Sequence, residues 1–331
     1  MAFKILITGA SGFIGRHLVE EALQRNMEVY AAVRASSSRK HLTDPRIHFF
    51  PFDMTHPGQV HRDLKKFQSE MGGFQYVIHN AAVTAPKDVT EFISCNADFT
   101  REFARMLMET QHGMHKFVYM SSMASIGPGD PASMRVIDEK HPRRPVTPYG
   151  HSKLLAERFI HEIEEFPYVI LRPSGVYGPG DLKFVIRVIM MMKKGIEVSI
   201  GPADQQASYV HADDLAHLTI DACLSKVQRE DFNVADGYFY TQNEFNAFLK
   251  KALGVRTIGV RIPTQVLVAA GFATFHLGQI AKRPTRLSHL KMRELTARNW
   301  KVDITKAKEQ LGFDPKFNLE RGLQNVVDSL E

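Results

Sequence analysis

Cysteine is scarce in this sequence, and its scarcity excludes proteins built on disulfide frameworks. The 331 residues include 2 cysteines, Cys95 and Cys223, which do not have the spacing of a metal site. We therefore expect two free thiols and a reducing, cytoplasmic compartment. The 15 histidines include no His-Glu-x-x-His pattern, so we expect no bound metal.

The sequence also lacks a membrane-spanning run and a strongly basic arm. Its N-terminus enters an apolar segment at once, so we expect no signal peptide. The most apolar stretch, residues 264–281, is short for a span and is interrupted by glycine, histidine and glutamine. A core helix is its simplest interpretation, with a substrate flap or a membrane-surface contact as alternatives. The net charge of +6 is spread along the chain, which argues against a nucleic-acid partner.

A glycine-rich segment opens the chain, with the sequence KILITGASGFIG from Lys4 to Gly15. An apolar strand, a glycine turn and an amphipathic helix follow one another there. Gly9 permits a tight turn, Gly12 lets the backbone approach a pyrophosphate, and Gly15 lets helix and strand pack closely. The helix N-terminus offers free N–H groups to an anion. We predict a dinucleotide site whose contacts also include Ser11, Phe13 and Ile14.

Apolar runs alternate with amphipathic segments through the first half of the chain, which predicts an α/β fold with a doubly wound parallel sheet. We expect strands at residues 5–7, 28–33, 47–52, 76–79, 116–120 and 168–171, and helices at 58–71, 90–112 and 148–165. Residues 1–173 would form the nucleotide-binding domain. Residues 174–331 would be mainly a substrate-binding region, interleaved with the last sheet elements near residues 232–235.

The end of the second predicted strand bears on the choice of cofactor. NAD-binding domains place an acidic residue there to bind the ribose 2′-hydroxyl. This sequence has Val33 and then Arg34, followed by Ser36, Ser37 and Ser38. An arginine with hydroxyls nearby suits a 2′-phosphate, which a carboxylate would repel. We therefore favour NADP, with NAD as the alternative, although Arg34 could also be a simple exposed charge.

Short and polar residues follow two other predicted strands. Asp53 and Met54 come after the third strand, and Asn80, Ala81 and Ala82 come after the fourth. The carboxyl ends of parallel strands form the ligand side of such a sheet. We expect these residues to contact the cofactor, although Asp53 could instead cap the turn that follows it.

Three residues further along can carry proton chemistry. Tyr149 and Lys153 are four apart on a predicted helix and so share one face. An ammonium nearby lowers a phenol pKa, which allows Tyr149 to act as general acid or base on a hydroxyl or carbonyl. Lys153 can also bind the nicotinamide ribose. Ser122, at a strand end, can donate a hydrogen bond to the reacting oxygen, with Ser121 as the alternative serine.

Taken in order, these motifs resemble the extended short-chain dehydrogenase/reductase superfamily, whose members include the epimerase/dehydratase-like enzymes. The resemblance rests on TGASGFIG, Asp53, Asn80-Ala81-Ala82, Ser121-Ser122, Tyr149-xxx-Lys153 and Arg172-Pro173 with VYGPG after it, and it covers nearly the whole chain. It implies a Rossmann core, a C-terminal substrate domain and a catalytic set of Ser122, Tyr149 and Lys153. It also places Asn96 and Pro173 at the cofactor and implies a homodimer.

Departures from the superfamily pattern indicate the branch. Met123 stands where sugar-nucleotide 4,6-dehydratases carry an acidic residue, and Val33-Arg34 is similar to the dihydroflavonol reductase and 3β-hydroxysteroid dehydrogenase branch. The resemblance thus implies an NAD(P)-dependent oxidoreductase that moves a hydride between nicotinamide and a secondary alcohol or ketone. Its substrate would be a hydrophobic or alicyclic small molecule. A nucleotide-sugar epimerase with tightly bound NAD and a non-catalytic cofactor-sensing protein are the alternatives.

Overall fold

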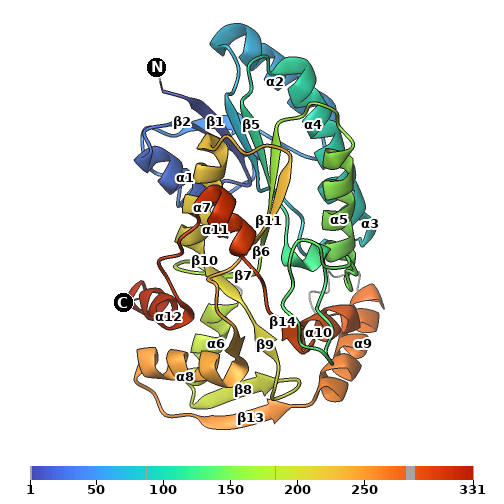
Figure 1. Cartoon of the computed structure of the whole chain (residues 1–331), viewed down its shortest axis with the longest axis vertical. Helices are drawn as coiled ribbons and strands as arrows, with labels where there is room; N and C mark the ends of the chain where they lie inside the picture. Colours follow the sequence, from blue (N-terminus) through green and yellow to red (C-terminus); the bar gives the residue numbers. More distant parts are fainter. Residues whose placement is uncertain (1, 87, 183, 281–287, 331) are drawn as a thin grey trace.

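Seven parallel strands form the central sheet of the computed structural model, in the order β11-β6-β5-β4-β1-β2-β3 (Figure 1). The model describes residues 2–86, 88–182, 184–280 and 288–330. The seven strands are β1 (Lys4–Thr8), β2 (Glu28–Val33), β3 (His48–Pro51), β4 (Tyr76–His79), β5 (Lys116–Met120), β6 (Tyr168–Pro173) and β11 (Glu230–Val234). The strand order reverses between β1 and β4, which is where a doubly wound sheet opens a crevice at its carboxyl edge. The predicted fold class is confirmed.

Helices cover both faces of this sheet and bury an apolar core on each side. One face packs against α1 (Phe13–Gln24), α7 (Ala212–Leu224) and α11 (Thr305–Leu311). The other packs against α2 (Pro57–Met71), α4 (Phe99–Thr110) and α5 (Pro148–His161). The inner strands β1, β2, β4, β5 and β6 are mostly apolar because both of their faces are covered.

The predicted elements of the first half match the structure closely, with one exception. The predicted strands at 28–33, 76–79 and 116–120 agree residue for residue. The predicted helix at 90–112 is instead three pieces, α3 (Thr90–Ile93), a π-helical turn (Ser94–Asp98) and α4. Asn96 lies in the π-helical turn and is buried.

Smaller elements gather beyond the carboxyl edge of the sheet, at the lower end of Figure 1. They form three short sheets, β10-β7, β12-β9-β14 and β13-β8. The strands are β7 (Gly175–Tyr177), β8 (Ile196–Ile200), β9 (Gln206–Ala207), β10 (Tyr209–His211), β12 (Tyr240–Thr241), β13 (Ile258–Ile262) and β14 (Asn299–Trp300). The helices are α6 (Val185–Met192), α8 (Gln242–Leu253), α9 (Thr264–Ile280), α10 (His289–Leu295) and α12 (Leu319–Asp328). Because α7 and β11 return to the central sheet, the division near residue 173 stays a prediction.

Helix α9 differs from the core helix that its apolar sequence predicts. Among its side chains at residues 264–274, Gly271 alone is buried, and Val266 and Phe272 are 56% and 41% exposed. The helix lies along α10, where the Phe272 ring stacks on His289 with centroids 4.0 Å apart. The core interpretation is therefore wrong for these residues. In the ranges that the model describes, no helix combines the length and apolar character needed to cross a membrane.

Candidate active site

The glycine turn after β1 is shaped by close backbone contacts. Gly9 has a φ of +67°, and a Cβ on it would lie 2.9 Å from the Ala81 Cα atom. A Cβ on Gly15 would lie 2.1 Å from the Gly9 carbonyl oxygen, so α1 packs directly against the turn. Gly12 is the N-cap of α1, where the helix presents its free N–H groups. These features fit a bound pyrophosphate.

A cleft of about 710 Å³ runs along the carboxyl ends of the strands from this turn to α5. The predicted cofactor contacts that line it are Gly9, Ser11, Gly12, Phe13, Ile14, Arg34, Asp53, Met54, Asn80, Ala81, Ala82, Tyr149, Lys153 and Pro173. The walls are mostly backbone and short side chains. A dinucleotide is an extended ligand that fits a cleft of this kind.

Gly15 and Asn96 are not among the residues that line the cleft. The Asn96 side chain is buried, and its Oδ1 accepts a hydrogen bond from the Val83 N–H at 2.7 Å. Its Nδ2 donates to the Val83 carbonyl at 2.9 Å and to the Ser152 Oγ at 3.1 Å. Asn96 thus ties the loop after β4 to α5. A direct contact between Asn96 and the cofactor stays a prediction.

The end of β2 presents hydroxyl and basic groups to the cleft. Arg34, Ser37, Ser38 and Lys40 all line it. Arg39 does not, and its guanidinium lies over the Phe49 ring at 4.3 Å from the centroid. The cleft therefore has a basic, hydroxyl-bearing corner where NAD-binding domains have a carboxylate.

Tyr149, Lys153 and Ser122 lie together at the other end of the cleft. Thr147 caps α5 by accepting the Gly150 N–H at 3.2 Å, which places Tyr149 in the first turn of α5. One turn later, the Lys153 Nζ donates to the Met120 carbonyl at 2.7 Å and lies 6.0 Å from the centroid of the Tyr149 ring. Ser122 follows β5, and its hydroxyl is within hydrogen-bonding reach of Tyr149.

Burial sets the proton affinities of the tyrosine and the lysine. It raises the pKa of Tyr149, and the Glu294 carboxylate acts in the same direction, while the hydrogen bond from Ser122 opposes them. Burial also lowers the pKa of Lys153 to about 7, against the opposing effect of Glu157. The expected lowering of the tyrosine pKa is therefore wrong for this chain by itself. Loss of hydration disfavours the charged form of each group and is the largest contribution to both shifts.

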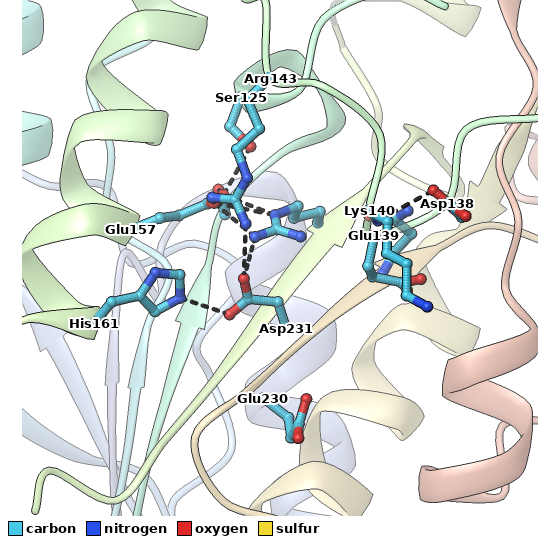
Figure 2. Close-up of polar contacts among 12 residues, drawn as sticks. Ser125, Asp138, Glu139, Lys140, Arg143, Glu157, His161, Glu230 and Asp231 are labelled. Atoms are coloured by element: carbon cyan, nitrogen blue, oxygen red, sulfur yellow. Dashed lines mark hydrogen bonds and ion pairs between the residues drawn. The ribbon is translucent and has the colours of Figure 1, made fainter.

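A buried ionic cluster supports the turn that carries Ser122 (Figure 2). Glu157 is fully buried and accepts hydrogen bonds from Ser121, from Ser125 at 2.7 Å and from the Arg143 Nη1 at 2.7 Å. Arg172, which is also fully buried, donates to it from Nη2 at 2.8 Å. The Ser121 hydroxyl is thus turned towards Glu157. Of the two neighbouring serines, Ser122 is the one near Tyr149.

Asp231 completes this cluster from β11. It accepts hydrogen bonds from the Arg143 Nη2 at 3.0 Å and from Arg172, and its other oxygen lies 2.9 Å from the His161 Nε2 (Figure 2). These contacts hold the pKa of Asp231 below its usual range despite its burial, which acts in the opposite direction. Two carboxylates face two arginines, so the buried charges are compensated.

A second cavity, of about 380 Å³, adjoins the cleft at Ser122. Pro173, Ser174 and Val176 also belong to both. The remaining walls include five aromatic side chains, Phe184, Tyr209, Tyr240, Phe245 and Trp300. We call this space the apolar cavity. Ser122 therefore lies at the boundary between the cleft and the apolar cavity.

The apolar cavity contains one charged pair that sequence reasoning missed. Lys291 and Glu294, both on α10, line it, and the Lys291 Nζ lies 3.0 Å from the Glu294 Oε2. The Glu294 side chain is 9% exposed. A lysine and a glutamate three residues apart are common on helix surfaces, so the sequence carries no signal for this placement.

Comparisons with known proteins cover almost the whole chain. A family model described as "NAD dependent epimerase/dehydratase family" matches residues 5–235. The chain is 26% identical over 342 residues to the UDP-glucose 4-epimerase of Vibrio cholerae, covering 99% of this chain and 96% of that protein. It is 22% identical over 345 residues to the sterol-4-alpha-carboxylate 3-dehydrogenase, decarboxylating, of Saccharomyces cerevisiae, covering 98% and 97%.

Solved structures share the fold. The UDP-glucuronic acid 4-epimerase of Bacillus cereus, in complex with NAD, superimposes with a TM-score of 0.75 at 22% identity. The match covers 99% of this chain and 98% of that one. The chain therefore shares the fold of this structure, while its relatives differ in the reactions that their names state.

Proposed function

The chain belongs to the NAD dependent epimerase/dehydratase family, and within that family we propose that it is an NAD(P)-dependent oxidoreductase acting on a secondary alcohol or ketone. One observation carries the proposal. Ser122, Tyr149 and Lys153 line the cleft, and Ser122 also lines the apolar cavity. A carbonyl placed there would lie between a proton donor and the cofactor site.

Each of the three residues has a distinct part. Tyr149 gives a proton to the substrate oxygen during reduction and takes it back during oxidation. Ser122 holds that oxygen by a hydrogen bond, and Lys153 holds the ribose and stabilises the phenolate. When bound, the nicotinamide would supply or accept the hydride. Lys153 is buried, whereas Ser122 and Tyr149 are partly exposed to the cleft and can reach a ligand there.

NADP is the cofactor that the cleft favours. Arg34 and Lys40 supply positive charge and Ser37 and Ser38 supply hydroxyl donors at the place where a 2′-phosphate would lie. NAD remains the alternative, because the structural neighbour named above contains NAD.

The apolar cavity favours a substrate without phosphate groups. Among the described residues that line it, the charged ones are Lys291 and Glu294, which neutralise each other. A nucleotide sugar carries a diphosphate, which requires unpaired cations or several N–H donors. Five aromatic walls suit a hydrophobic or alicyclic alcohol instead. The similarity to a sterol dehydrogenase agrees with this choice.

A nucleotide-sugar epimerase is the second candidate, favoured by the relatives that carry that name. Such an enzyme uses the same three groups but restores its nucleotide in every turnover, so it must retain it tightly.

Two measurements on purified protein separate the candidates. Mass spectrometry identifies any nucleotide retained after gel filtration, and oxidation of NADPH is then followed with a panel of alicyclic ketones. We expect an empty or loosely occupied site and ketone-dependent NADPH oxidation. Stoichiometric NAD with interconversion of UDP-sugars would favour the epimerase. Nucleotide binding without turnover of either class would favour a cofactor-sensing protein.

A further inference from the structure

The two-stranded sheet of β8 and β13 exposes part of its apolar side to the exterior. Its strands read IEVSI and IGVRI, alternating between apolar and polar or small residues. On a half-buried strand the apolar side chains normally face the protein. Here the polar side packs inwards on β8, where Ser199 is 7% exposed and its Oγ accepts the Asn246 Nδ2 of α8 at 3.2 Å, while Arg261 on the same side of β13 is exposed. Ile258, in contrast, is 77% exposed.

The strand register makes the apolar side continuous across both strands. Ile196 lies opposite Ile258 and Val198 opposite Val260 in a parallel pair, and alternate residues of each strand point to the same side. Ile196 and Val260 are 44% and 47% exposed. We call the set the β8–β13 apolar face, and it consists of Ile196, Val198, Ile200, Ile258, Val260 and Ile262.

One end of this face is exposed on the exterior, and the other end lines the apolar cavity. Val198 and Ile200 line the cavity, whereas Ile196, in the same row, is exposed. Helix α9 follows β13 after Pro263, contains no acidic, lysine or arginine residue, and exposes Val266 and Phe272. Strands β8 and β13 and helix α9 all lie towards the lower end of the molecule in Figure 1.

Basic side chains border the β8–β13 apolar face at one end. Lys193 and Lys194 precede β8 and Arg256 precedes β13, and the starts of parallel strands lie at the same edge. All three are exposed, and none forms an ion pair with another described residue. Glu197, the acidic residue of β8, alternates to the opposite face and lies 2.8 Å from the Lys250 Nζ of α8.

We infer that the β8–β13 apolar face docks on an anionic lipid bilayer. Exposed apolar side chains enter the boundary of the acyl chains, and unpaired lysine and arginine bind anionic headgroups. A second copy of the chain is a poorer occupant, because a two-fold contact brings together the same face, which offers these cations no unpaired carboxylate among the described residues. The docking rests on exposure and charge alone. That a bilayer-borne substrate would reach Ser122 by this route rests in addition on the proposed function.

Vesicle flotation of the full chain, without cofactor or substrate, tests the docking. We expect binding to phosphatidylcholine vesicles that contain phosphatidylglycerol, and about a hundredfold less to phosphatidylcholine alone, since each of the three basic residues at the surface contributes about 1 kcal/mol. The double substitution Ile258→Asp and Val260→Asp should abolish binding, and Lys193→Glu with Lys194→Glu should reduce it by about tenfold or more. The matched controls are Met71→Asp and the pair Lys65→Glu and Lys66→Glu, on exposed positions of α2 at the far end of the molecule.

The controls should bind as the unmodified chain does, and so should Tyr149→Phe, because docking involves no catalysis. Absence of binding to the anionic vesicles would overturn the inference, as would binding that survives both double substitutions. Gel filtration supplies the remaining check. If the unmodified chain is a dimer that Ile258→Asp with Val260→Asp converts to a monomer, the face is a contact between copies and the inference is wrong.

Discussion

The two cavities that meet at Ser122 are built in different ways. The cleft is formed largely by backbone and short side chains at the ends of adjacent parallel strands. The apolar cavity is formed by the turn at residues 122–124 and by larger side chains from segments between residues 173 and 302, which belong to the short strands and to nearby helices. Backbone recognises what all dinucleotides share, whereas large side chains select one substrate shape. The cleft thus indicates the class of reaction, and the apolar cavity indicates the class of substrate.

Tyr149→Phe tests the junction between the two cavities and has the largest expected effect. Removing the phenol proton should lower kcat/KM for ketone reduction by about 10²- to 10⁴-fold, which is the usual contribution of a general acid. Nucleotide affinity, measured by calorimetry, should stay nearly unchanged. Tyr238→Phe, at a position that is 60% exposed, is the matched control and should keep full activity. Turnover retained in Tyr149→Phe would remove this residue from the mechanism.

Arg172→Met tests whether the ionic cluster holds the cleft side of the junction. The substitution leaves the fully buried Glu157 with Arg143 as its remaining arginine partner. Removing one member of a buried ion pair leaves the other charge buried without its partner, so the free energy of unfolding measured in urea should fall by about 3 kcal/mol. Lys251→Met breaks the exposed pair with Glu320 and should leave the urea midpoint unchanged. Equal effects of the two substitutions would contradict a supporting role for the cluster.

Arg34→Asp tests the cofactor end of the cleft. Losing a charge-assisted contact to the 2′-phosphate, and adding a repulsion, should raise the KM for NADPH by about tenfold or more. The KM for NADH should change little. Arg39→Asp provides the control, because Arg39 lies over Phe49 outside the cleft. A preference for NADH in the unmodified chain would refute the choice of NADP.

Glu294→Gln tests whether the apolar cavity influences the proton chemistry, and its expected effect is the smallest. The Glu294 carboxylate raises the pKa of Tyr149, so neutralising it should lower that pKa. Alcohol oxidation requires the phenolate, and its rate against pH should therefore rise at a lower pH in the variant. Glu309→Gln, on an exposed position of α11, should leave the profile in place. A shift towards higher pH would show that the interaction has the opposite sign.

The contrast between the cleft and the apolar cavity explains how much of the site the sequence could predict. Gly9, Asn80, Ser122 and Tyr149 each follow or begin an element with a strong local pattern, so their meeting at one sheet edge follows from the topology. The hydrogen bonds of Asn96 to Val83 and Ser152 could not be predicted, because they depend on the tertiary packing of the loop after β4 against α5. The direction of the shift in the Tyr149 pKa could not be predicted, because it depends on burial, which no local sequence pattern reports.

The substrate side offered fewer local signals. Lys291 and Glu294 reach the cavity from α10, far along the chain from Ser122, and only tertiary packing brings them there. The alternation in β8 and β13 predicts two half-buried strands but not which face is covered. The apolar sequence of residues 264–281 likewise indicates a helix without stating what it contacts. Residues 281–287 lie outside the described ranges, so the end of that stretch is not placed.

Transfer of deuterium from NADPH labelled at the nicotinamide C4 tests the central claim most directly. The labelled cofactor is incubated with the protein and an alicyclic ketone, and the product is analysed by mass spectrometry. Our account predicts one deuterium on the carbinol carbon and stoichiometric formation of NADP. An alcohol without deuterium would contradict it, as would unchanged NADPH together with interconversion of UDP-sugars on retained NAD.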